Sequence, residues 1–151
     1  MLTAGHVNWD VTLRVDRLPE PDGESRISSL RSSGGGSAAN VAVALSKLAV
    51  GSGLIGSVGD DQHGHLAHRE LAGADVDLTG LRDVEAAETA VKYLLVEEDG
   101  EVAVLGNEGA NEAVAPGDVD PAYVAQITLA DLLGRRPDRR VEAVVVFLRD
   151  G

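Results

Sequence analysis

The pattern of apolar and polar positions in the first quarter of the chain predicts one strand followed by a polar excursion. Residues 1–15 carry apolar and β-branched side chains at intervals, which is typical of a strand. Residues 17–36 are mostly polar and are interrupted by two prolines and four glycines. Such residues favour turns, so we expect short extended segments within a loop-rich region there.

A helix and a buried strand are predicted next. Residues 37–50 carry apolar side chains at helical spacing, and alanine fills many of the positions between them. Ser37 is the expected N-cap, because a serine hydroxyl can accept a hydrogen bond from a free N–H group at a helix start. We expect Gly51 and Gly53 to end this helix and residues 54–58 to form a short buried strand.

The same pattern continues with a second helix and another strand. A turn at residues 59–61 should precede a helix from about Gln62 to Leu71, with either aspartate of the turn as its cap. This helix should end at Gly73, because glycine favours the residue after a helix. Residues 76–81 predict another short strand.

The last third of the chain predicts a hairpin, a helical stretch and a final strand. Residues 89–105 contain two apolar, β-branched runs around an expected turn at residues 98–100. Residues 114–133 have a helical pattern interrupted by two prolines, and residues 143–148 form an unbroken apolar run typical of a strand covered on both faces. Strands separated by helices predict one α/β domain, and the hairpin predicts a small antiparallel appendage to its sheet.

Composition and charge exclude several classes of protein. The chain has 151 residues, with 25 acidic and 13 basic side chains and a net charge of −12, which argues against a nucleic-acid partner. It has no apolar run of the roughly 20 residues that a membrane-spanning helix needs, and its first residues do not resemble a secretory signal. Without cysteine it has no disulfide or cysteine nucleophile. We therefore expect a cytoplasmic protein that binds neither nucleic acid nor membrane.

The basic residues are two lysines and eleven arginines, and only 3% of the residues are aromatic. An acidic surface with few lysines is similar to that of proteins from salt-loving microbes, in which salt screens the repulsion between carboxylates. Compositional drift in a genome rich in G and C is the alternative. Both interpretations stay open.

Two other motifs have simpler explanations than the chemistry they suggest. Residues 51–56 match G-x-G-x-x-G, but a dinucleotide site needs these glycines after a strand and before a helix, whereas here they follow a helix. His63, His65 and His68 lie close in sequence, but no nearby residues clearly complete a tetrahedral metal site. We interpret them as a solvated helix face, with a metal site as the alternative, and assign no metal ligands.

Five residues near two Gly-rich or polar segments are candidates for binding a polyhydroxylated ligand. Asn8 and Asp10 are two apart at a strand end, so their side chains should share a face. A carboxylate beside an amide can bind two neighbouring hydroxyl groups in a fixed orientation. Gly35 and Gly36 would let backbone N–H groups approach such a ligand, and Asn40 in the first helical turn would add an amide.

In this order, the motifs resemble the ribokinase family of PfkB-type carbohydrate kinases. The resemblance rests on "GGGSAANVAVALSKL" at residues 34–48 and "LIGSVGDDQHG" at residues 54–64. The hairpin "TAVKYLLVEEDGEVAV" and the "GAN" at residues 109–111 are similar to the lid of that family and to the segment that follows it. The resemblance is good to about residue 120.

This resemblance implies a fold and a partner. The chain is expected to be the N-terminal part, residues 1–151, of a ribokinase-like domain, a doubly wound α/β sandwich. A small β-sheet lid, made of about residues 12–33 and 89–107, should close over the sugar and form a homodimer with a second copy. Asn8, Asp10, Gly35, Gly36 and Asn40 correspond to the sugar-contacting residues of the family.

The resemblance also implies phosphoryl transfer from ATP, with Mg²⁺, to a sugar hydroxyl. The family's general base and its ATP-binding residues belong to a C-terminal half whose G-A-G-D motif does not occur in this sequence, so we expect no catalytic residue here and no activity of the isolated chain. The alternative is a non-catalytic carbohydrate-binding or dimerisation module derived from such a kinase. Ser37 stands where ribokinases usually carry Lys, and Ala90 where Gly is common, so the sugar stays open.

Overall fold

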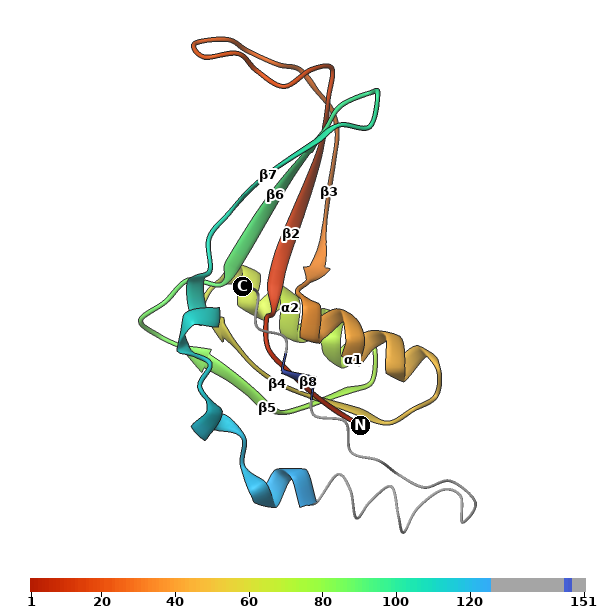
Figure 1. Cartoon of the computed structure of the whole chain (residues 1–151), viewed down its shortest axis with the longest axis vertical. Coiled ribbons are helices and arrows are strands. Elements are labelled where there is room, and N and C mark those ends of the chain that lie inside the picture. The colour runs from red at the N-terminus through yellow and green to blue at the C-terminus, as the bar shows by residue number, and fades with distance from the viewer. Residues whose placement is uncertain (126–145, 148–151) are drawn as a thin grey trace.

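The computed structural model describes residues 1–125 and 146–147 of the chain (Figure 1). Its elements form two separate four-stranded sheets, with the strand orders β5-β4-β1-β8 and β3-β2-β6-β7. In chain order, the elements are β1 (Leu2–Ala4), β2 (Asn8–Val15), β3 (Ile27–Gly35), α1 (Ser37–Lys47), β4 (Ser52–Gly59), α2 (Gln62–Gly73), β5 (Val76–Val84), β6 (Ala90–Val96), β7 (Val102–Gly106), the 3₁₀ helices η1 (Gly109–Ala113) and η2 (Pro116–Asp118), and β8 (Val146–Phe147).

The first sheet is parallel in all of its pairings and forms the core of the molecule. Its strand β4 is buried along its whole length, because both of its faces are covered. Leu54 and Val58 face the helices and pack in one apolar cluster with Ala42 of α1 and Leu71 of α2. Ile55 faces the other way and packs against Tyr123. Both faces of the parallel sheet are therefore covered by other parts of the chain, as in an α/β sandwich.

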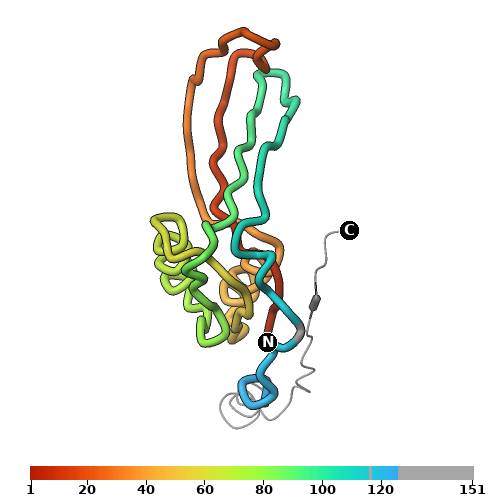
Figure 2. The backbone as a smooth tube through the Cα atoms, turned by 90° about the vertical axis from the view of Figure 1, so that its left-hand side faces the viewer, coloured from red at the N-terminus to blue at the C-terminus, as the bar shows by residue number. Residues whose placement is uncertain are grey.

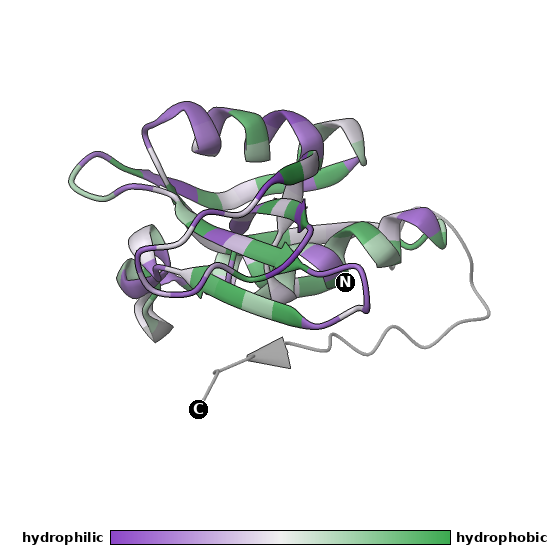
Figure 3. Ribbon diagram, turned by 90° about the horizontal axis from the view of Figure 1, so that it is seen from above, coloured by the Kyte–Doolittle hydropathy of each residue, from purple (hydrophilic) through white to green (hydrophobic). Residues whose placement is uncertain are grey.

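The second sheet projects away from this core, as Figures 1 and 2 show, and we call it the projecting sheet. Its central pair, β2 and β6, is parallel, whereas β3 and β7 flank it in antiparallel orientation. Large apolar side chains are exposed on the projecting sheet. Figure 3 colours the ribbon by hydropathy and shows hydrophobic and hydrophilic segments alternating along the chain. These exposed side chains are Ile27, Leu30, Tyr93, Val102, Val104 and Leu105.

The predicted α/β class and the predicted hairpin are confirmed, but the hairpin belongs to the separate projecting sheet and is not an appendage to the core sheet. The first 36 residues also differ from the prediction. The single strand expected over residues 1–15 is two strands in different sheets, because the chain turns at Gly5, whose φ of 141° few other residues adopt. Within the polar region expected to hold short extended segments, residues 17–26 form a loop and the remainder forms one long strand, β3. Its side chains are nearly all exposed, so it pairs through its backbone and needs no apolar pattern.

Both helices are confirmed, with corrections at the ends of the first. Gly36, not Ser37, is the N-cap of α1, and no side chain caps this helix. The helix ends at Lys47, before the predicted glycines, and the chain reverses at Ala49 with a φ of 58°. Gly53 lies within β4, which is why the glycines of residues 51–56 do not open a helix.

Later elements also depart from the prediction in their extent. Strand β5 continues three residues beyond the predicted end at Leu81, to Val84. Of the helical stretch predicted over residues 114–133, the structure describes a 3₁₀ turn at η2 and helical residues 121–125, and the remainder lies outside the described residues. The predicted final strand is described at Val146–Phe147, parallel to β1. In the described part of the chain, no helix is long and apolar enough to cross a membrane.

Candidate functional site

The five candidate residues lie around the place where the two sheets meet. Strand β1 of the core ends at Ala4, and after a short turn the chain enters the projecting sheet at Asn8. Strand β3 returns to the same place, since Asn8 pairs with Gly35 in the register of β2 and β3. Helix α1 begins directly afterwards. The candidates thus gather beyond the carboxyl end of a core strand, where open α/β sheets commonly bind ligands.

Asn8 is held in a fixed orientation by a residue distant in sequence. Its side chain is buried, and its Oδ1 accepts a hydrogen bond from Nδ2 of Asn111 at 2.9 Å. The other side-chain atom of Asn111, its Oδ1, accepts from the backbone N–H of Val7 at 2.9 Å. The Oδ1 of Asn8 already accepts one hydrogen bond, whereas its amide N–H groups form none with the described residues, so these N–H groups are what Asn8 can most readily offer to a ligand.

Asp10 presents an oxygen atom that has no partner. Its Oδ1 is buried, and among the described residues no donor forms a hydrogen bond with it. Burial raises the pKa of this carboxyl above its usual value, and the positive charge of Lys92 offsets part of that effect. A buried polar atom without a partner lowers stability, and its presence commonly has a functional reason. A ligand hydroxyl would supply the missing hydrogen bond.

Gly35 and Gly36 are required by their surroundings. A Cβ on Gly35 would overlap the carboxylate of Asp10, so the glycine gives that side chain its place. Gly36 has a φ of 98°, and a Cβ there would overlap the backbone carbonyl of His6. The two glycines therefore allow β3 and α1 to approach the start of β2 closely.

Asn40 completes the group, although Asp10 lies slightly apart from the nearest cavity. Asn8, Gly35 and Asn40 line a cavity of about 220 Å³ that also contacts Lys47 and Glu70. Asp10 is not among its lining residues, but its carboxylate lies against Gly35. Next to Gly36, the hydroxyl of Ser37 is buried and has no partner among the described residues.

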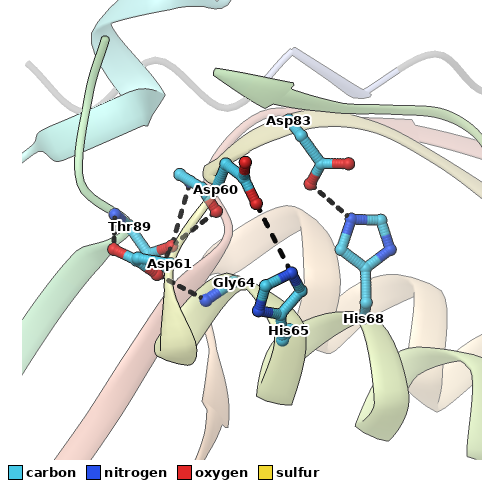
Figure 4. A network of polar contacts seen from close by, with 8 residues as sticks. Asp60, Asp61, Gly64, His65, His68, Asp83 and Thr89 are labelled. Carbon is cyan, nitrogen blue, oxygen red and sulfur yellow. Dashed lines mark hydrogen bonds and ion pairs between the residues drawn. The ribbon is translucent and has the colours of Figure 1, made fainter. Parts of the chain in front are cut away.

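A second polar network joins the start of α2 to the projecting sheet (Figure 4). The carboxylate of Asp61 accepts from the N–H of Gly64 at 2.8 Å, from the hydroxyl of Thr89 at 2.7 Å and from the N–H of Thr89 at 2.8 Å. Burial by itself raises the pKa of Asp61, but these hydrogen bonds outweigh it and hold the pKa below its usual value. The prediction that an aspartate of this turn caps the second helix is confirmed.

The three histidines of α2 have separate surroundings. His65 lies 3.4 Å from Asp60, and His68 lies 2.9 Å from Asp83, as Figure 4 shows. The ring of His63 instead stacks on Trp9, with centroids 6.4 Å apart. His63 also lines a larger cavity of about 460 Å³, between α2 and the projecting sheet.

Sequence reasoning missed the residues that hold the candidates in place. Asn111 belongs to the "GAN" segment, but its contacts to Val7 and Asn8 span more than 100 positions and leave no local pattern. Glu70 was also missed: its Oε2 accepts from the N–H of Gly34 at 2.9 Å and ties α2 to β3. An exposed acidic residue on an amphipathic helix is a weak signal for such a contact.

The fold and the site define an α/β protein with a polar site at the junction of its core and a projecting sheet. The family model for pfkB family carbohydrate kinases matches residues 1–141. The chain belongs to the pfkB family of carbohydrate kinases, and its resemblance to ribokinases is confirmed.

Individual relatives agree with this assignment. The ATP-dependent ribose-1-phosphate kinase of Halopiger xanaduensis is 64% identical over 138 residues, which is 91% of this chain and 47% of the relative. The ribokinase of Schizosaccharomyces pombe is 31% identical, covering 99% of this chain and 48% of the relative. This chain therefore spans about half the length of these relatives.

The fold is shared with solved ribokinase structures. The structure of Arabidopsis thaliana ribokinase complexed with ribose and ATP superposes with a TM-score of 0.72 and 26% sequence identity. The match covers 84% of this chain and 41% of that one. The predicted ribokinase-like fold class is thereby confirmed.

Proposed function

We propose that this chain carries the acceptor-sugar site and the lid of an ATP-dependent carbohydrate kinase. The complete enzyme would transfer the γ-phosphoryl group of ATP to a sugar hydroxyl. The observation that carries this proposal is the buried, unpartnered Oδ1 of Asp10 beside the fixed amide of Asn8. Membership of the carbohydrate kinase family supports the choice of a sugar as the ligand.

In this proposal, each candidate residue has a defined role. Asp10 accepts hydrogen bonds from sugar hydroxyls, and the amide N–H of Asn8 donates to a neighbouring one. Gly35 leaves room for the carboxylate, Gly36 brings the start of α1 close to the sugar, and Asn40 adds a second amide. These contacts position the acceptor, which is one part of phosphoryl transfer.

The acceptor is a pentose or a pentose phosphate. The relative with 64% identity is named for ribose 1-phosphate, and the relative with 31% identity is a ribokinase. Ser37 has a short hydroxyl side chain at a position where we expect ribokinases to carry Lys, so the two acceptors need not be bound alike.

We assign no residue to ATP or Mg²⁺. Within the described residues, no group of three or more His, Asp or Glu side chains is arranged to hold a metal ion. The isolated chain is therefore expected to bind sugar without phosphorylating it. Titration with Mg-ATP tests this: binding at the affinity of a complete kinase would contradict it, whereas sugar binding alone also fits a non-catalytic carbohydrate-binding module.

We further propose that the projecting sheet is the lid and that it pairs with a second copy of the chain in the cytoplasm. Its exposed apolar side chains, among them Leu30, Tyr93 and Leu105, would be covered in such a dimer. Sedimentation equilibrium checks this directly. A monomer at high protein concentration would contradict the dimer without affecting the sugar site.

The sugar site itself is tested by calorimetric titration of the parent chain and Asp10→Ala with ribose and ribose 1-phosphate. Loss of the carboxylate should weaken binding by about 1–3 kcal/mol, because bound hydroxyls lose their acceptor. Arg69→Ala, an exposed change on α2, is the control and should bind like the parent. Equal affinity in the parent and Asp10→Ala would remove Asp10 from the site.

A further inference from the structure

Lys92 is placed directly beside the candidate sugar site. Strands β2 and β6 run parallel, and Asp10 and Lys92 are partners in their register, so both side chains leave the same face of the projecting sheet. The charge of Lys92 acts on the Asp10 carboxyl. Even so, Lys92 forms no ion pair with any carboxylate among the residues that the structure describes.

A second basic residue lies on the same face of the sheet as Lys92. In β7, the partner of Lys92 is Gly106. A Cβ at position 106 would lie 3.1 Å from Cγ of Lys92, so the glycine leaves room for the lysine side chain. Arg31 lies one step further along the sheet, as the partner of Thr12, and it is exposed. At the paired positions of this face, Asp10 is the only acidic residue.

These charges differ from those of the rest of the protein. The chain carries a net charge of −12, so its average field repels an anion. A neutral sugar needs no cation beside Asp10, and Lys92 would offer it little. A sugar that carries a phosphate ester brings nearly two negative charges next to the Asp10 carboxylate, and this arrangement requires a nearby cation to offset the repulsion.

We propose that Lys92, assisted by Arg31, forms a subsite for a phosphate ester already present on the acceptor sugar. This inference rests on the proposed function, because it places the phosphate relative to a sugar held by Asn8 and Asp10. Lys92 binds the phosphate directly, whereas Arg31 lies two strands away and attracts the anion over a longer distance. The chain therefore selects a phosphorylated pentose over the free pentose.

The test is calorimetric titration of the parent chain, Lys92→Met and Lys92→Arg with ribose, ribose 1-phosphate and Mg-ATP. Methionine keeps the length of the lysine stem without its charge. We expect Lys92→Met to bind ribose 1-phosphate about 10- to 100-fold more weakly, because it loses a charge-assisted hydrogen bond. Its affinity for ribose should stay within about twofold, and Lys92→Arg should keep most of the parent's preference.

A second readout separates a charge contact from a change in shape. In the parent, affinity for ribose 1-phosphate should fall with rising potassium chloride, because salt screens the attraction between charges. In Lys92→Met this salt dependence should be reduced, and for ribose it should be small in both chains. Arg69→Met removes an exposed positive charge on α2, outside this face, and should behave like the parent.

Each outcome decides between the subsite and the proposed function. Weaker binding of ribose 1-phosphate alone in Lys92→Met supports the subsite. Equal ribose 1-phosphate affinity in parent and Lys92→Met, with both ligands lost in Asp10→Ala, overturns the subsite and leaves the sugar site standing. Loss of Mg-ATP binding alone in Lys92→Met assigns the lysine to the nucleotide and also overturns it. Absence of sugar binding by the parent contradicts the proposed function, and the subsite with it.

Discussion

The carboxylate of Asp10 occupies the space that a side chain on Gly35 would need. The two residues are on neighbouring strands, β2 and β3, and are offset by two residues in the register, since Gly35 pairs with Asn8. Any larger residue at position 35 would displace the carboxylate. Gly35 thus acts on the proposed ligand through Asp10, in addition to leaving its own backbone accessible.

Gly35→Ala is therefore expected to weaken sugar binding although alanine is small. The added methyl group must push Asp10 away from its present position, so the contacts with bound hydroxyls are lost and the binding free energy falls by about 1–3 kcal/mol. Titration with ribose measures this. Gly73→Ala, at the end of α2, has open space around the new methyl group and is the matched control. Equal ribose binding in the parent and Gly35→Ala would show that the carboxylate does not need this place.

Asp10→Asn should stabilise the ligand-free chain at neutral pH and weaken its binding of sugar. Because burial raises the pKa of Asp10, the folded state holds the proton more tightly than the unfolded state does. The free energy of unfolding therefore falls as the pH rises from the ordinary aspartate pKa through the raised one, and the cost remains at neutral pH. The amide carries no such cost.

Thermal unfolding at a series of pH values checks this prediction. At pH 7 the melting temperature of Asp10→Asn should exceed that of the parent, and the difference should shrink toward pH 3, where Asp10 is protonated in both states. A parent that is more stable than Asp10→Asn at pH 7 would mean that the carboxylate has a structural partner. A variant with higher stability and weaker ribose binding is typical of a functional residue.

The contact between Asp61 and Thr89 should have the opposite effect on the pH dependence of stability. Hydrogen bonds lower the pKa of Asp61, so its stabilisation is present above the ordinary aspartate pKa and is lost as the pH falls through the lowered value. Thr89→Val removes the hydroxyl that joins Asp61 and Gly59 and should destabilise the fold by about 1–3 kcal/mol at pH 7.

Denaturant unfolding of Thr89→Val and of Thr12→Val gives the comparison. Thr12 lies in β2, and its hydroxyl makes no hydrogen bond with the described residues, so its replacement should have a smaller effect. The gap in stability between parent and Thr89→Val should narrow at pH 2–3, as Asp61 becomes protonated. A difference in stability that stays constant over this pH range would show that the hydrogen bond to Thr89 does not stabilise the ionised form of Asp61.

Salt should stabilise the whole chain if its acidity is an adaptation. With a net charge of −12, repulsion between carboxylates opposes the compact state, and molar potassium chloride screens it. We expect the melting temperature to rise steeply from low to molar salt. A flat melting temperature would favour compositional drift instead.

The sequence predicts the elements that have a local pattern and fails where contacts between distant residues decide the structure. The helix capped by Asp61 and the hairpin over β6 and β7 follow from spacing and turn residues within a few positions. Strand β3 could not be predicted, because it is stabilised by backbone pairing with β2 and its side chains are exposed. The N-cap of α1 was wrong because the close approach of His6 requires a glycine at position 36.

The candidate site shows the same division. Asn8, Asp10, Gly35 and Asn40 could be selected from residue type and from resemblance, and the structure brings them to one junction. The partner of Asn8 could not, because Asn111 reaches it from a segment 103 positions away. A local pattern reveals which side chains face a site, but the residues that orient them depend on the completed fold.

The most direct test of the proposed function is to locate bound sugar on the chain by NMR. Backbone amide signals of the isotope-labelled parent chain are recorded while ribose and then ribose 1-phosphate are added. We predict the largest shifts at residues 7–10 and 34–40 and at Lys92, around Asp10. Shifts centred on the other cavity, near Asp61 and His63, or no shifts with either sugar, would contradict the proposal that this junction is the acceptor site.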